Sequence, residues 1–111
     1  MTKFLALYLG SPDLSAPAPP DEAAIAKGMA AWGAWMAEHS AQTVDSGGPL
    51  GKTKKTSKAG VSDTRNNVAG YIIVEAESHE AAAKLFEGHP HFTIFPGDSV
   101  EIMECLPIPG S

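Results

Sequence analysis

Two short segments of the chain are apolar at almost every position, a pattern typical of buried β-strands. In residues 3–9 (KFLALYL), apolar side chains occupy both alternating sets of positions, and residues 70–76 (GYIIVEA) form a second strong strand pattern. A strand that is apolar on both faces must be covered on both. Because helices of so short a chain can cover one face, the sequence predicts that something else covers the other.

A helical pattern follows each of these segments, and each begins after a residue suited to cap a helix. Asp21 precedes an Ala-rich run that extends to about His39, and Ser78 precedes a second run that Gly88 ends. Short polar side chains accept hydrogen bonds from the first N–H groups of a helix, and glycine suits its end. Apolar spacing of three and four predicts one buried stripe on the first helix, consisting of Ile25, Met29, Trp32 and Met36.

Three further strands are predicted from weaker signals, over residues 41–45, 58–63 and 98–106. Ser46-Gly47-Gly48-Pro49 is expected to end the first of them, and residues 50–58 are expected to form a polar loop. The resulting order is β-α-β-β-β-α-β, which predicts an α+β protein. The expected plan is a ferredoxin-like split βαβ, in which two helices lie on one face of an antiparallel sheet that carries a hairpin extension.

Length and composition fit one soluble domain without special covalent support. The chain has 111 residues and a formal net charge of −5, so it would repel nucleic-acid phosphates. No apolar run approaches the ~20 residues of a membrane span, and the N-terminal run is too short for a signal peptide. The single cysteine, Cys105, excludes an intrachain disulfide and is predicted to be a small core hydrophobe. A cytoplasmic location is the expectation.

The basic side chains cluster in one polar stretch. Four lysines lie within seven residues, at Lys52, Lys54, Lys55 and Lys58. A solvated loop is the favoured interpretation, and contact with an anion is the alternative.

Several segments, in this order, resemble the YCII-related or DGPF-type family. They are KFLALYLG, AWGAWMAEH, VDSGGPLG, GYIIVEAESHEAAAKLFEGHPHF and SVEIMECLP, and they cover nearly the whole chain. The resemblance implies one YCII-related domain over residues 1–111. It also implies a dimeric α/β barrel, in which two ferredoxin-like sheets pack face to face with their helices outside. A second copy of the chain would then cover the exposed face of the first strand.

The resemblance also implies an acid–base site, although only part of it is present. Members of the family often carry a His/Asp pair, whose histidine lies on the first helix. Ala31 and Trp32 stand at that place here, while Asp45 is the candidate acidic partner.

The remaining candidates for proton transfer are His89 and His91 in the connector HPHF. In an extended connector their rings would face the same way, and histidine exchanges protons near neutral pH. They could act as acid, base or polar anchor, or they could satisfy loop hydrogen bonds and cap a helix. With Asp45 they supply too few ligands for a convincing zinc site, so neither a metal nor another cofactor is predicted.

Aromatic residues supply the candidate ligand contacts. Tyr8 and Tyr71 could anchor a ligand through their hydroxyls, and Trp32 could form a pocket wall; core packing is the alternative for each. Tyr8 would lie beside Asp45 if their strands are neighbours. Two functions remain open: a cofactor-independent lyase or isomerase that acts on a small organic molecule, and a small-ligand-binding or interaction module without chemistry.

Overall fold

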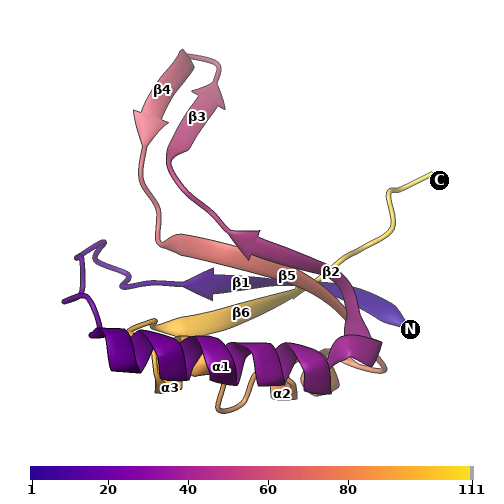
Figure 1. Cartoon of the computed structure of the whole chain (residues 1–111). Coiled ribbons are helices and arrows are strands. Elements are labelled where there is room, and N and C mark those ends of the chain that lie inside the picture. Colours follow the sequence, from indigo (N-terminus) through magenta and orange to yellow (C-terminus); the bar gives the residue numbers. More distant parts are fainter. Residues whose placement is uncertain (111) are drawn as a thin grey trace.

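Four strands form one antiparallel sheet, with the helices on one of its faces (Figure 1). The structure is a computed structural model that describes residues 1–110. In the order in which they lie side by side, the strands are β2 (Thr43–Pro49), β5 (Val68–Ala76), β1 (Thr2–Leu9) and β6 (Ser99–Glu104). The helices are α1 (Glu22–Glu38), the 3-10 turn η1 (Ser40–Gln42), α2 (His79–Lys84) and α3 (Pro90–Thr93).

This strand order confirms the predicted ferredoxin-like plan. The connection from β1 through α1 to β2 skips one place in the sheet, which β5 fills. The connection from β5 through α2 and α3 to β6 skips another, which β1 fills. The two halves therefore interlock, and β1 lies between β5 and β6 along most of its length.

The predicted N-caps of both helices are confirmed. The Asp21 side chain accepts a hydrogen bond of 2.7 Å from Ala24 N, and Ser78 Oγ accepts one of 3.0 Å from Ala81 N. Each cap satisfies an N–H group that the helix itself leaves without a partner. Both starts depend on residues within one helical turn, which is why they could be read from the sequence.

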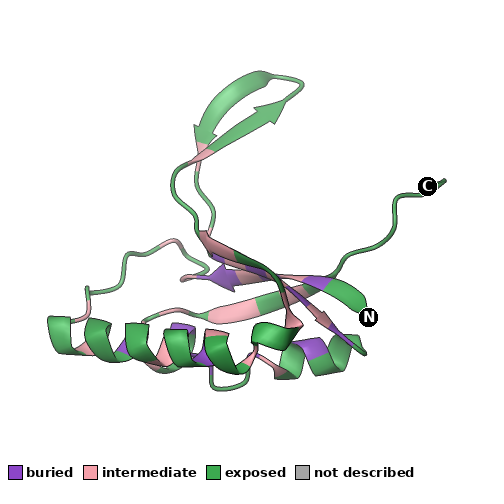
Figure 2. Ribbon diagram, turned by 45° about the vertical axis from the view of Figure 1, so that its right-hand side comes forward, coloured by how far each residue is buried: buried purple, intermediate pink, exposed green. Residues whose placement is uncertain are grey.

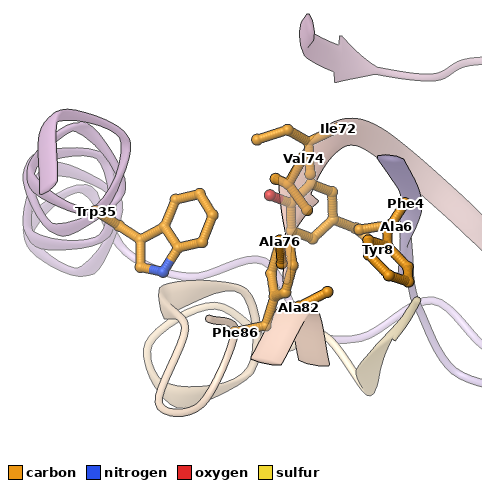
Figure 3. Close-up of a cluster of buried hydrophobic side chains, with 9 residues drawn as sticks. All are labelled: Phe4, Ala6, Tyr8, Trp35, Ile72, Val74, Ala76, Ala82 and Phe86. Atoms are coloured by element: carbon orange, nitrogen blue, oxygen red, sulfur yellow. The ribbon is translucent and has the colours of Figure 1, made fainter. Parts of the chain in front are cut away.

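The core lies between the sheet and its helices (Figure 3). Trp35 closes it from α1, and its Nε1–H donates a hydrogen bond of 3.0 Å to the Leu85 carbonyl. Phe86 packs beneath the tryptophan, with ring centroids 5.1 Å apart. The buried hydrophobic cluster consists of Phe4, Ala6, Tyr8, Trp35, Ile72, Val74, Ala76, Ala82 and Phe86.

The buried stripe predicted for α1 is wrong in its N-terminal half. Ile25 is 43% exposed and Met29 is 61% exposed, whereas Gly28 and Trp35 are buried. The helix buries its C-terminal half against the core, but near Met29 it borders a pocket instead. Helical periodicity identifies the face that turns toward the sheet, and it cannot tell whether that face meets side chains or a cavity.

Two predictions about the middle of the chain are also wrong. The strand β2 continues through Ser46–Pro49, because register shifts let this glycine-containing stretch pair with β5. Residues 50–58, expected to be a loop, contain β3 (Thr53–Ser57), which pairs with β4 (Gly60–Thr64) as a separate hairpin. Figure 2 shows this hairpin exposed along most of its length, well away from the sheet. Its strands are joined across the pair by an ion pair of 2.6 Å between Lys54 and Asp63.

The face of the sheet away from the helices has an apolar centre, with Lys3, Glu75 and Glu101 on the same face, and no element among the described residues covers it. Leu5 pairs with Ile73 on one side and Met103 on the other, and Leu7 pairs with Tyr71. These residues alternate along their strands with residues buried against the helices. We call this set (Leu5, Leu7, Tyr71, Ile73 and Met103) the open face.

Two smaller findings complete the fold. Cys105 is exposed just after β6, so the prediction of a core cysteine is wrong: the final strand ends at Glu104 before it can bury this side chain. The longest helix has 17 residues, and no described helix combines the length and the apolar character that a membrane span requires.

Candidate functional site

A pocket of about 390 Å³ lies between the N-terminal half of α1 and one end of the sheet. Strands β1, β2 and β5 supply its floor, and α1, α3 and the segment after α3 supply the rest. The volume lies in the range of pockets that hold small organic molecules. The lining residues are Tyr8, Met29, Trp32, Ser46, Gly48, Pro49, Ala69, Gly70, Tyr71, His91 and Phe95.

The walls of the pocket are largely aromatic, and no lining residue carries a formal charge as Asp, Glu, Lys or Arg. The Trp32 ring lies 5.0 Å from the Tyr8 ring and 6.0 Å from the Phe95 ring, measured between centroids. Phe95 can pack this close to α1 only because residue 28 is glycine, since a Cβ there would overlap the phenyl ring. The pocket therefore suits a flat, uncharged ligand, because a buried charge without a partner is costly.

His91 is one of the polar residues in this lining, which also contains Tyr8, Ser46 and Tyr71. Its Nε2 lies 2.8 Å from the Leu9 carbonyl oxygen, which can only accept, so Nε2 carries a hydrogen. In the neutral ring Nδ1 is then an acceptor, and no described residue donates to it. Gln42 Oε1 is the only fully enclosed side-chain polar atom that lacks a partner in residues 1–110. Nδ1 of His91 therefore borders accessible space, and the imidazole lines the pocket.

His91 is held in this position by its surroundings. The ring packs against Gly97, where a Cβ would overlap the imidazole, and the Gly97 N–H donates to the His91 carbonyl at 2.9 Å. The histidine therefore has both its backbone and one ring nitrogen fixed before any ligand arrives.

His89 is fully buried behind the pocket rather than in its lining. Its Nδ1 accepts a hydrogen bond of 2.9 Å from His91 N, which caps α3. Burial is the largest cause that lowers the pKa of His89, from 6.5 to about 4, and positive charge on His91 and His39 adds to it. At neutral pH the ring is therefore uncharged, with its hydrogen on Nε2.

Tyr8 is another polar residue of the lining. His89 Nε2 lies 3.5 Å from its hydroxyl oxygen, so the long contact is donated by the imidazole and the tyrosine hydrogen is left free. Burial raises the pKa of Tyr8, which keeps the phenol protonated at neutral pH. Figure 3 shows the hydroxyl directed toward the side on which Trp35 of α1 lies. Tyr8 therefore offers a hydrogen-bond donor.

The structure brings Tyr8, Trp32, His89 and His91 together but leaves Asp45 outside this group. Asp45 is exposed on β2, where its carboxylate accepts a hydrogen bond of 2.8 Å from Gly47 N. Tyr8 was expected beside Asp45 only if their strands are neighbours, and they are not, because β5 separates β1 from β2 in the sheet.

Tyr71 lines the pocket at its edge. Gly70 and Ile72, its neighbours on β5, are buried toward the helices. Strand alternation therefore directs the Tyr71 side chain to the open face.

The histidine connector also differs from the prediction. It is one turn of helix rather than an extended segment, with Pro90 at its first position. A local signal was available, since proline favours the first turn of a helix. The contributions of Phe95, Met29 and Ser46 were missed altogether as pocket residues, and no local pattern indicates them. Among residues 1–110, no three His, Cys, Asp or Glu side chains gather in a way that could hold a metal ion.

Comparison with known proteins supports the fold alone. A solved structure of 5-chloro-2-hydroxyhydroquinone dehydrochlorinase (TftG) from Burkholderia phenoliruptrix AC1100, in complex with 2,5-dihydroxybenzoquinone, is similar to this chain. The TM-score is 0.54 at 19% sequence identity, over 90% of this chain and 89% of the other. No family model matches the chain, and no curated protein matches it.

Proposed function

We propose that this protein is a cofactor-independent enzyme that moves a proton on a small, uncharged, cyclic organic molecule. The observation that carries the proposal is that one apolar pocket of about 390 Å³ holds both Tyr8 and His91. The histidine has an acceptor nitrogen without a protein partner, and the tyrosine has a free hydroxyl hydrogen. We further propose that the chain is a YCII-related domain of the DGPF type, in which this pair replaces the His/Asp pair of the family.

In the proposed mechanism His91 Nδ1 takes a proton from the bound molecule and returns it at another position. Tyr8 donates a hydrogen bond to the oxygen on which negative charge then develops. His89 does not touch the ligand; it is a positioning residue that orients the Tyr8 hydroxyl and the start of α3. Such a reaction is of the lyase type if a leaving group departs and of the isomerase type if none does.

The similar solved structure agrees with this proposal at the level of ligand size. That protein is a dehydrochlorinase that binds a small quinone. Since the likeness is one of fold, the chemistry proposed for this chain is argued from Tyr8 and His91.

One observation favours the alternative function, a binding module without turnover. No carboxylate lines the pocket, and Asp45 is occupied elsewhere. A second general acid or base would thus be lacking if the reaction needs one.

Proton exchange with solvent separates the two functions. We expect the protein to accelerate exchange of the α-hydrogens of cyclohexane-1,2-dione in D2O, followed by proton NMR, by about a hundredfold or more. His91→Gln keeps a donor for the Leu9 carbonyl but removes the basic ring nitrogen, so the rate should fall to that of buffer. If the dione binds the wild type but exchanges no faster than in buffer, the protein is a binding module.

We also propose that a second copy of the chain covers the open face. Leu5 lies at its centre, between Ile73 and Met103, and all three would otherwise meet water. Light scattering at micromolar concentration should give a dimer for the wild type and a monomer for Leu5→Lys. A matched change on exposed α1, Ala30→Lys, should leave the dimer intact. A wild-type monomer at that concentration would overturn this part of the proposal.

A further inference from the structure

We infer that the pocket selects ligands in which a hydroxyl group and a carbonyl group lie side by side on a planar ring, that is, enolic or phenolic hydroxy-ketones. The inference rests on the proposed site and specifies its substrate class. It follows from the tautomers that the hydrogen bonds impose on the two histidines, because these determine which pocket atom donates and which accepts.

The first step is a chain of two hydrogen bonds that run in one direction, from the His91 backbone through His89 to Tyr8. His91 N–H donates to His89 Nδ1 at 2.9 Å, so that nitrogen has no hydrogen of its own. The neutral His89 ring must then carry its hydrogen on Nε2, which faces the Tyr8 oxygen at 3.5 Å. Because the tyrosine oxygen receives this contact, its hydrogen has no protein acceptor among the described residues, and Tyr8 lines the pocket. We therefore infer that this hydrogen donates to the ligand. A ligand carbonyl oxygen is the matching group.

The second step concerns the ring nitrogens of His91. His91 Nε2–H is engaged by the Leu9 carbonyl at 2.8 Å, so the neutral ring has only Nδ1 left to offer, as an acceptor. A ligand hydroxyl is the matching group. The Tyr8 and His91 ring centroids lie 5.3 Å apart, so one small ligand can contact both side chains.

The third step is the shape and charge of the remaining lining. Trp32 and Phe95 supply flat apolar walls, and the lining has no Lys or Arg to neutralise an anion. A ring with a carboxylate would be buried without a positively charged partner and is therefore excluded. A neutral hydroxy-ketone brings no charge into the pocket and needs no such partner.

Proton transfer from the ligand hydroxyl to His91 needs no further reactant. The ligand O–H bond breaks, its proton forms the Nδ1–H bond of His91, and the electron pair stays on the ligand as an enolate. That charge is delocalised onto the carbonyl oxygen, which accepts the Tyr8 hydrogen bond. The resulting imidazolium and enolate neutralise each other inside the pocket.

A matched set of probes tests the inference on the full chain. Tropolone carries a hydroxyl beside a carbonyl on a planar ring, 2-methoxytropone lacks the hydroxyl hydrogen, and benzoate carries a charge. Titration calorimetry should show tropolone binding about tenfold more tightly than 2-methoxytropone, the usual worth of one hydrogen bond. Benzoate should bind more weakly than either.

Two variants then identify the groups responsible. His91→Gln should abolish the preference for tropolone, because the amide oxygen of glutamine cannot take the place of Nδ1 while its NH2 group keeps the bond to Leu9. Tyr8→Phe should weaken both tropones by about tenfold and leave the preference unchanged. Amide NMR spectra of both variants report whether the fold is kept; if His91→Gln unfolds, His91→Asn provides the second test, since it retains an acceptor near Nδ1 and should keep the preference.

The outcomes separate this inference from the proposed function. If tropolone and 2-methoxytropone shift the pocket amides but bind equally, or if the preference survives in His91→Gln, the substrate class is wrong and the pocket remains a site. If neither probe shifts any pocket amide, the proposed site itself is overturned.

Discussion

The two faces of the sheet are made by the same strands but have opposite characters. Toward the helices, Ile72 and Val74 are fully enclosed, and the buried histidines and Tyr8 share directed hydrogen bonds. On the open face, Ile73 is only half-buried, and no element among the described residues covers the apolar side chains. Strand alternation thus places hydrogen-bonded polar groups on one face of the sheet and leaves uncovered apolar side chains on the other.

This difference shows which interactions each face can use. A non-directional apolar surface suits association with a second copy, since burial of any complementary apolar area is favourable. The helix face carries instead a chain of oriented donors and acceptors, which suits recognition of one ligand geometry. We therefore propose that one face serves assembly and the other serves chemistry.

The largest expected effect comes from two adjacent isoleucines on opposite faces. Ile72→Ala should lower the free energy of unfolding by about 3–4 kcal/mol, because it leaves a cavity in the core. Ile73→Ala should cost about 1 kcal/mol or less in monomer stability, since this side chain is already partly in water, and it should weaken the dimer. Urea denaturation of both variants in the monomeric Leu5→Lys background checks the contrast; equal losses would contradict it.

The pH dependence of stability is the next effect in size. The folded state lowers the pKa of His89 to about 4, so the unfolded chain binds more protons between pH 6.5 and 4. The contribution of His89 is thus fully present above pH 6.5 and is lost as the pH falls toward 4, by up to about 3 kcal/mol. Urea denaturation as a function of pH measures this slope.

A matched variant isolates the histidine. His89→Gln should be less stable at neutral pH and should have a flatter profile between pH 6.5 and 4. An unchanged slope would show that another group is responsible.

The smallest effect compares two glycines on α1. Gly28→Ala forces its Cβ against the Phe95 ring at the pocket wall and should cost about 1–3 kcal/mol. Gly33→Ala meets no atom within 4 Å and should stabilise the helix by up to about 1 kcal/mol. Thermal melts of the two variants measure the difference. If both changes stabilise the protein, Phe95 does not pack against this helix as described.

The fold could be predicted because its signals are local or periodic. Asp21 and Ser78 cap their helices within one turn, and the alternation in residues 70–76 identifies a strand whichever neighbours it has. The prediction that the glycine stretch Ser46–Pro49 ends a strand was wrong for the opposite reason. Its local composition favours a turn, and pairing with β5 overrides that preference.

The candidate site could be predicted only in part. Tyr8, Trp32, His89 and His91 were recognised as chemical groups, but their roles depend on contacts between distant parts of the chain. Tyr8 and His89 are 81 residues apart in sequence, and Leu9 and His91 are 82 apart. These contacts fix the tautomers, and no local pattern encodes them. Asp45 was selected for its position in the sequence, and the intervening strand β5 removes it from the site.

The hydrogen positions on the histidine rings provide the most direct test of the account, because both the donor and the acceptor of the pocket depend on them. Long-range proton–nitrogen NMR correlations on ¹⁵N-labelled protein at neutral pH distinguish the two tautomers, with His89→Gln and His91→Gln used for assignment. The account predicts hydrogen on Nε2 of both rings, and a shift of His91 Nδ1 when tropolone is added. Hydrogen on Nδ1 of His89, or a neutral His91 with hydrogen on Nδ1, would contradict it.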